Sequence, residues 1–168
     1  MIPIKTPAEL DCMRTACRLS ARILAEVVAQ VRPGATTGEL DAFAAGRMQA
    51  LGVKSAFFGY GGFPGYTCIS LNEEVVHGIP GSRVINAGDL VSVDLGVVAE
   101  GFIGDNATTV CVGAVDAESA RLCEVTEASL MAGIEAAQAG RHLSDIGHAV
   151  QTVAEAAGFS VVREYCGH

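Results

Sequence analysis

The sequence predicts an α+β fold in which helices come first, antiparallel strands follow and further helices come after them. Three observations support this order. Apolar residues recur at helical spacing near the N-terminus, two apolar strand-like runs flank a polar break in the middle, and helical spacing returns after residue 117. Because no internal repeat or linker interrupts the pattern, we expect a single domain over residues 1–168.

The first two helices are predicted from their start signals and their apolar spacing. Thr6 followed by Pro7 indicates a helix start, because a cap residue precedes a proline at the first helical position. Thr36 and Glu39 have the spacing of a capping box, so a second helix is expected up to Leu51. The first helix has one buried face at spacings of three and four residues: Leu10, Met13, Cys17, Ala21, Leu24, Val28 and Val31.

The rest of the chain divides into loops, strands and two more helices. The stretch 55–66 is rich in glycine and aromatic residues and is predicted to be a loop, and a strand is expected at 67–71. One helix is expected over 117–138, and another from Ser144, whose hydroxyl can cap it. A last short strand is predicted at 159–165, where the sequence reads FSVVREY.

Two aspartates, Asp94 and Asp105, are the most informative pair in the chain. They lie in SVDLGVVAEGFIGDNATTV, on two strand-like runs. If Ala99 and Glu100 form a two-residue hairpin turn, Asp94 falls directly opposite Asp105, where Cβ atoms are roughly 5 Å apart. Two ionised carboxylates there repel each other, and either a shared proton or a divalent cation would relieve the repulsion. The alternative is that one aspartate lies in the turn and the other is solvated.

Composition and charge argue against several classes of function. A net charge of −8 disfavours a nucleic-acid-binding surface, and no apolar run is long enough to span a membrane. The start, MIPIKTPAEL, lacks the basic and apolar regions of a signal peptide. The six cysteines are scattered without CxxC spacing, which fits reduced thiols. We therefore expect a cytoplasmic protein.

Two histidines add to the candidate site. His77 precedes the letters GIP, so it is expected at a strand end or in a loop, although a lone histidine is often structural. His168 is the last residue of the sequence. With the two aspartates, it forms a partial set of oxygen and nitrogen ligands for a hard or borderline divalent ion.

Four motifs follow one another along the chain: NEEVVHGIP, VDLGV, GDNATT and REYCGH. With the opening IKTPAELDCMRTAC, they make the whole sequence similar to the type I methionine aminopeptidases. The resemblance implies the pita-bread α+β fold of creatinase and methionine aminopeptidase, in which two similar halves enclose a dinuclear metal site. It also implies removal of the initiator methionine from new polypeptides whose second residue is small.

The resemblance implies a role for each matching residue. Asp94 matches a ligand of one metal, Asp105 matches the aspartate that bridges both metals, and His168 matches the histidine ligand. His77 matches the catalytic histidine beside the substrate, which binds the scissile peptide or stabilises the transition state. The pocket for the methionine side chain is matched by Tyr60, Phe63, Cys68 and also Phe57, which stands where other members often carry cysteine.

Cofactors and partners follow from the same resemblance. Two divalent metal ions, of Mn, Fe, Co or Zn, are expected, and together they would activate a water for attack on a peptide carbonyl. The implied partners are a peptide or nascent protein that begins with Met, and the ribosome that presents it. The chain itself is expected to be a monomer.

The resemblance departs from the family at the C-terminus. The family continues beyond the YCGH motif with a second active-site histidine and two glutamates that complete the metal site, whereas this sequence ends at His168. We therefore expect a fragment that lacks the C-terminal part of the fold and is inactive alone, with a natural short homologue of lost activity as the alternative. A non-catalytic pita-bread binding module and a creatinase- or prolidase-like metallopeptidase also stay open.

Overall fold

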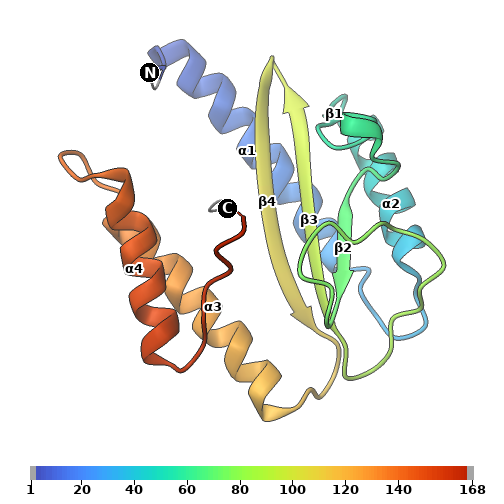
Figure 1. Ribbon diagram of the computed structural model, residues 1–168. Coiled ribbons are helices and arrows are strands. Elements are labelled where there is room, and N and C mark those ends of the chain that lie inside the picture. The colour runs from blue at the N-terminus through green and yellow to red at the C-terminus, as the bar shows by residue number, and fades with distance from the viewer. Residues whose placement is uncertain (1–2, 166–168) are drawn as a thin grey trace. The chain divides into compact units, whose positions relative to one another are not determined.

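The chain divides into two compact units, Met1–Val115 and Asp116–His168, and the computed structural model describes residues 3–165. In the described residues, the first unit combines two long helices with a four-stranded sheet, and the second is a pair of helices (Figure 1). The α+β class is confirmed, whereas the single domain stays a prediction. No helix in this part of the chain is both long and apolar enough to cross a membrane.

The helices and strands follow one another in an order close to the predicted one. They are α1 (Pro7–Val28), α2 (Thr37–Ala50), β1 (Lys54–Ser55), the short 3-10 helix η1 (Tyr60–Gly62), β2 (Cys68–Leu71), β3 (Leu90–Ala99), β4 (Phe102–Cys111), α3 (Ala117–Ala136) and α4 (Leu143–Ala156).

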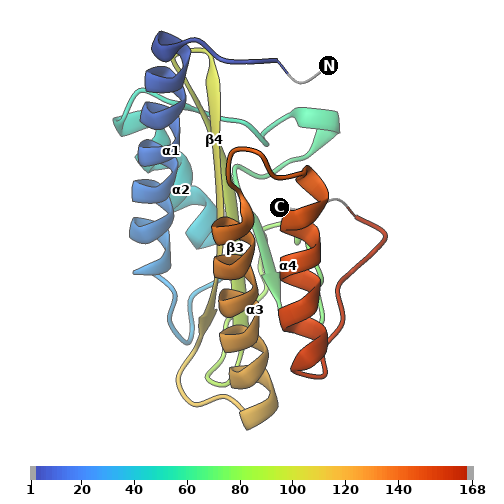
Figure 2. The ribbon, with the colours of Figure 1, turned by 90° about the vertical axis from the view of Figure 1, so that its left-hand side faces the viewer.

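Both N-terminal helices begin where the sequence predicts, each with a capping box, although a box was predicted only for Thr36. The Thr6 hydroxyl accepts the backbone N–H of Glu9, while the Glu9 carboxylate accepts the N–H of Thr6. Thr36 and Glu39 make the same reciprocal pair at α2. Each box satisfies two backbone groups that a helix end would otherwise leave without partners. The two helices cover the same face of the sheet, as Figures 1 and 2 both show.

The strand β3 is the centre of an antiparallel sheet. It pairs with β4 along its whole length on one edge, and with β2 and β1 on the other. Every second side chain of β3 is fully buried in the core that the sheet forms with α1 and α2: Val91, Val93, Leu95 and Val97. This alternation is the period-two pattern of a sheet that packs one face on helices.

Close contact between α1 and β4 fixes which face of the hairpin is buried. A Cβ atom built at Gly104 would overlap the carbonyl group of Ala16, so only glycine fits there. The Ser20 hydroxyl donates a hydrogen bond of 3.3 Å to the carbonyl oxygen of Leu95 on the neighbouring strand. The helices therefore occupy this face, and the opposite face is left for the two aspartates.

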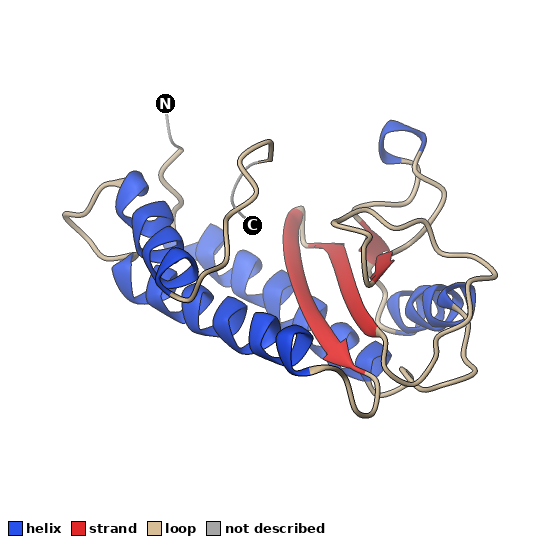
Figure 3. Cartoon of the chain, turned by 60° about the horizontal axis from the view of Figure 1, so that its bottom comes forward, coloured by secondary structure: helices blue, strands red, loops and turns tan. Residues whose placement is uncertain are grey.

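The second unit departs from the prediction at two places. α4 begins at Leu143 and not after Ser144, because the Asp145 carboxylate accepts the N–H of His142 at 2.9 Å and makes His142 the cap. The strand predicted at 159–165 does not form, and this segment is drawn as loop in Figure 3. A strand needs a neighbour for its backbone groups, and none of the described residues pairs with this segment.

Candidate metal and substrate site

The hairpin that carries the two aspartates forms with a turn one residue later than predicted. Ala99 pairs with Phe102, so the turn residues are Glu100 and Gly101. Both have positive φ, at 52° and 81°, as a two-residue hairpin turn of type I′ requires. Glycine reaches this conformation without strain, whereas the predicted turn would have placed Ala99 in it. The prediction that Asp94 lies directly opposite Asp105 is therefore wrong, because the observed register differs from the predicted one by two residues.

The shift by two residues leaves both aspartates on the same face of the sheet. Asp105 lies opposite Gly96, and Asp94 lies two residues before Gly96 on β3. Because side chains alternate with a period of two, Asp94 and Asp105 are diagonal neighbours, with Cβ atoms about 7 Å apart. Their meeting at one metal ion stays a prediction.

Cys68 joins this pair from the other side of β3. It lies on β2 directly opposite Asp94 and is buried. Burial, followed by the negative charges of Asp94, Asp105 and Asp41, raises the pKa of the Cys68 thiol to about 12. The thiol is therefore neutral at physiological pH, and its pKa responds to both carboxylates of the pair.

A glycine on β3 makes room for an aromatic wall beside the carboxylates. A Cβ atom at Gly96 would lie 2.9 Å from the Phe57 ring and 3.1 Å from the Cβ of Ala56. The backbone N–H of Ala56 also donates to the Gly96 carbonyl oxygen at 2.9 Å. Phe57 therefore packs over the position opposite Asp105. Gly96 was missed as a site residue, although an isolated glycine inside a strand pattern signals such a close approach.

The two other predicted pocket residues lie in the loop between β1 and β2. Tyr60 begins the short helix η1 and is 81 % exposed. Phe63 follows this helix, and its ring packs against Gly65, where a Cβ atom would come within 3.1 Å of it. An exposed Tyr60 does not enclose a pocket, so the role of both residues in binding a side chain stays a prediction.

His77 lies in a loop that is bonded to β2, as its sequence context predicts. Its φ of 60° is in the left-handed region, which is uncommon for a residue with a side chain. The next residue must be glycine, because a Cβ atom at Gly78 would overlap the carbonyl group of Ile69. The N–H of Ile69 donates to the Gly78 carbonyl oxygen at 3.0 Å. These contacts hold the His77 backbone beside the strand that carries Cys68.

The described residues supply part of the predicted metal site. Asp94 and Asp105 offer carboxylate oxygens on one face, which suits a hard or borderline divalent ion. His168, the third predicted ligand, lies outside the described residues. Within residues 3–165, no group of three or more His, Cys, Asp or Glu side chains is placed to hold a metal ion. The two carboxylates have the oxygen donors that a divalent ion prefers, and their role as metal ligands stays a prediction.

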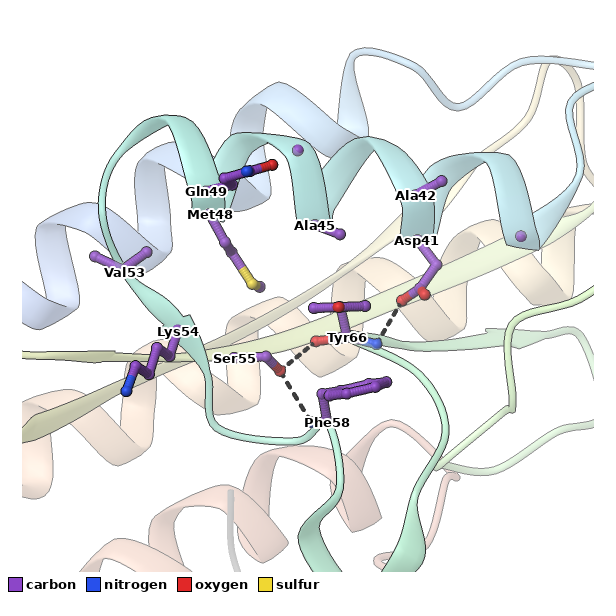
Figure 4. A pocket seen from close by; sticks show the side chains of 12 residues that line it. Asp41, Ala42, Ala45, Met48, Gln49, Val53, Lys54, Ser55, Phe58 and Tyr66 are labelled. Atoms are coloured by element: carbon purple, nitrogen blue, oxygen red, sulfur yellow. Dashed lines mark hydrogen bonds between the residues drawn. The ribbon is translucent and has the colours of Figure 1, made fainter.

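A separate cavity of about 930 Å³ lies between α2 and the segment 53–66 (Figure 4). Phe58 and Tyr66 stack within it, with ring centroids 4.5 Å apart. Asp41 on α2 connects the two sides of the cavity, since its carboxylate accepts the N–H groups of Tyr66 and Thr67 at 2.9 and 2.8 Å. None of the predicted site residues is among the described residues that line this cavity. It is therefore distinct from the aspartate pair.

Comparison with known proteins shows the family to which the chain belongs. The model of Metallopeptidase family M24 matches residues 11–168, and the chain belongs to this family. Within it, the chain is a homologue of the methionine aminopeptidases. It is 48% identical over 168 residues to methionine aminopeptidase 1 of Bacillus subtilis, covering 100% of this chain and 68% of that protein.

Solved structures show the same relationship in three dimensions. The crystal structure of methionine aminopeptidase from Thermotoga maritima superposes with a TM-score of 0.96 at 42% identity, over 100% of this chain and 68% of the other. The prolidase from Pyrococcus furiosus matches with a TM-score of 0.83 but only 22% identity, over 92% of this chain and 44% of the other, which shows a shared fold alone. The pita-bread fold and the relationship to methionine aminopeptidases are confirmed, and the chain spans about two thirds of the length of these relatives.

Proposed function

We propose that the protein removes the N-terminal methionine from polypeptides whose second residue is small, with metal ions held by Asp94, Asp105 and His168. The observation that carries the proposal is the hairpin register, which puts Asp94 and Asp105 on one face of the sheet beside Cys68. The high identity to methionine aminopeptidases, compared with fold-level similarity to a prolidase, favours methionine as the residue released.

The aspartates supply the negative charge that such a site needs. Two carboxylates on one face repel each other, so a divalent cation between them is favourable. When bound, ions such as Mn, Fe, Co or Zn lower the pKa of a coordinated water and so supply the nucleophile for peptide hydrolysis. By resemblance to the family, Asp105 on β4 would help to hold both ions, while Asp94 on β3 would hold one of them.

The other residues would bind the substrate and stabilise the reaction. A ring N–H of His77 can donate a hydrogen bond to the oxygen that becomes negative in the transition state. Cys68 stays protonated because its pKa is raised to about 12, so it adds no charge to the wall of the pocket. A neutral thiol and the Phe57 ring are polarizable surfaces that suit the thioether of methionine. Tyr60 and Phe63 would complete this pocket.

The partners that we propose follow from this chemistry. The substrate is a peptide or nascent chain with a free N-terminal methionine, presented at the ribosome to a monomeric, cytoplasmic enzyme. A net charge of −8 favours recognition of the peptide itself over binding to ribosomal RNA.

Methionine release from the peptide Met-Ala-Ser, with added Mn²⁺ or Co²⁺, tests the proposal. The chain is assayed alone and joined to the portion of the Bacillus subtilis relative that it does not span. We expect release by the joined form, rejection of Met-Leu-Ser, and loss of release in Asp94→Asn and His77→Ala variants. Release that persists in the Asp94→Asn variant, or no release by either form, would contradict the proposal.

In the joined form, His77→Ala should lower kcat more than it weakens metal binding. The reason is that His77 is assigned to the substrate and not to the metal. A His77→Ala variant that loses metal, yet turns over normally when metal is saturating, would reverse this assignment.

A further inference from the structure

The part of the loop next to His77 has no apolar anchor, because the loop's buried residue, Ile85, lies eight positions further along the chain. This loop, residues 72–89, leaves β2 and returns to β3, and its base is closed where the Asn72 side chain donates to the Asp89 carboxylate at 2.9 Å. Its apolar residues near His77 are exposed: Val75, Val76 and Ile79. Since little apolar surface is buried next to His77, hydrogen bonds to β2 and α2 contribute to the position of this part of the loop.

The first of these bonds comes from β2. The buried hydroxyl of Ser70 accepts the backbone N–H of Gly78 at 3.0 Å. Together with the bond between Ile69 and Gly78, it ties both backbone groups of Gly78 to one strand. Ser70 lies two residues after Cys68, the residue directly opposite Asp94. The peptide after His77 is therefore fixed relative to the strand next to the aspartates.

The second anchor comes from the start of α2. The Thr37 hydroxyl donates to the Gly81 carbonyl oxygen at 3.2 Å and accepts the Gly81 N–H at 2.9 Å. The N–H of Gly38 donates to the same carbonyl at 2.7 Å. A Cβ atom at Gly38 would lie 2.9 Å from that oxygen, so this close approach requires glycine. Thr37 is buried, and its hydroxyl therefore has these loop atoms in place of water as partners.

His77 lies just before the first anchor in a left-handed backbone conformation. That conformation costs about 1 kcal/mol for a residue with a Cβ atom, so the surrounding bonds must maintain it. We propose that Ser70 and Thr37 are positioning residues, which hold the His77 loop so that the imidazole faces the substrate. The effect of this positioning on turnover rests on the proposed function above. A displacement of about 1 Å of a catalytic group can lower a rate on the order of a hundredfold.

Amide hydrogen exchange in the 168-residue chain tests the positioning directly. We expect the Gly78 amide to exchange about fivefold faster in Ser70→Ala, the factor that corresponds to one lost hydrogen bond. Ser92→Ala is the matched control, because Ser92 lies opposite Ser70 in the sheet and bonds to Thr109 and not to the loop. Unchanged Gly78 exchange in Ser70→Ala, in a chain of unchanged stability, would overturn the proposal.

The Thr37 anchor offers a second test with a conservative rescue. Thr37→Val keeps the shape and removes the hydroxyl, so the Gly81 amide should exchange faster, and Thr37→Ser should restore its protection. If Thr37→Ser behaves like Thr37→Val, the lost methyl and not the hydroxyl matters, and the anchor is refuted. Should Thr37→Val fail to fold, Thr37→Ser still decides, because it must protect the Gly81 amide as the parent does.

Kinetics in the form that releases methionine then distinguishes positioning from general stability. Ser70→Ala and Thr37→Val should lower kcat about tenfold with KM within about twofold of the parent, while Ser92→Ala changes neither. Unchanged kcat alongside faster Gly78 exchange would show that the anchors do not act through His77. Absence of release from every form would refute the proposed function, and amide exchange alone would then decide whether Ser70 and Thr37 hold the loop.

Discussion

The two faces of the sheet in the first unit differ in what they contribute. The face toward α1 and α2 is apolar and fully buried at Val91, Val93 and Leu95. The opposite face of the same strands carries Asp94 and Asp105, together with serine and threonine hydroxyl groups. One face therefore supplies the stability of the unit, and the other carries the residues that we propose for the chemistry.

This division explains why the register matters so much to the site. A slip of one residue in a strand would exchange the two faces, bringing the carboxylates into the core. A slip of two residues keeps them on the same face and changes only which residue lies opposite which. The requirement for glycine at position 104, against α1, helps to exclude the harmful slip.

The largest effect on stability is expected at the contact between β4 and α1. Gly104→Ala should lower the free energy of unfolding by about 3 kcal/mol or more, because its Cβ atom would overlap the backbone of Ala16. Gly46→Ala is the control, since nothing lies within 4 Å of a Cβ atom there and alanine is the better helix former. Urea unfolding measures both. A Gly104→Ala chain as stable as Gly46→Ala would refute the close packing of this face.

A pair of substitutions on neighbouring strands tests whether the two faces contribute differently to stability. Leu95→Ala, in the buried face, should cost about 2–5 kcal/mol of stability. Asp105→Asn, on the exposed face of β4, should leave the free energy of unfolding within about 0.5 kcal/mol or raise it, because it removes one of two like charges. The division between the faces would be wrong if Asp105→Asn proved as destabilising as Leu95→Ala.

A smaller, pH-dependent effect is expected from Cys68. Its pKa in the folded chain is about 12, above the ordinary value of 9.0. Between these values the unfolded chain loses the thiol proton and the folded chain keeps it, so the stability that is present below pH 9 is lost as pH rises. Compared with Cys68→Ala, the parent should lose more stability over this range. Asp105→Asn should lower the thiol pKa, which iodoacetamide modification would detect, and an unaltered pH profile would place Asp105 away from Cys68.

The smallest effect is expected at an exposed pair of hydroxyl groups between β3 and β4. Ser92→Ala removes a hydroxyl–hydroxyl contact of 2.8 Å with Thr109. Because both groups can bond to water instead, thermal unfolding should show a loss of about 0.5 kcal/mol. A loss of stability as large as that of Leu95→Ala would mean that side chains on this face also contribute to the hydrophobic core.

The sequence predicted local structure where a local signal specified it. Thr6 is followed by a proline and Thr36 has a glutamate partner three residues later, so both helix starts could be predicted. The hairpin turn was misplaced because the pattern of apolar residues does not distinguish a register from one shifted by two. Only the need for positive φ at Glu100 and Gly101 distinguishes the two registers.

For a similar reason, only part of the candidate site could be predicted from the sequence. Asp94, Asp105 and His77 could be proposed as site residues because the motifs that carry them are short and continuous. Ser70 and Thr37 could not, since their bonds to Gly78 and Gly81 join segments 8 and 44 residues apart. Such contacts follow from the folded arrangement of β2 and α2 and have no signal in the local sequence.

Metal binding to the aspartate pair tests the central claim most directly. Co²⁺ titration, followed by calorimetry and by the absorption of the bound ion, is compared for the parent chain, Asp94→Asn, Asp105→Asn and Asp11→Asn. Asp11 is the control because it is an exposed aspartate on α1. We predict that the parent and Asp11→Asn bind Co²⁺ alike, and that each substitution in the pair weakens binding at least about tenfold. Equal binding by all four chains would contradict the assignment of Asp94 and Asp105 as metal ligands.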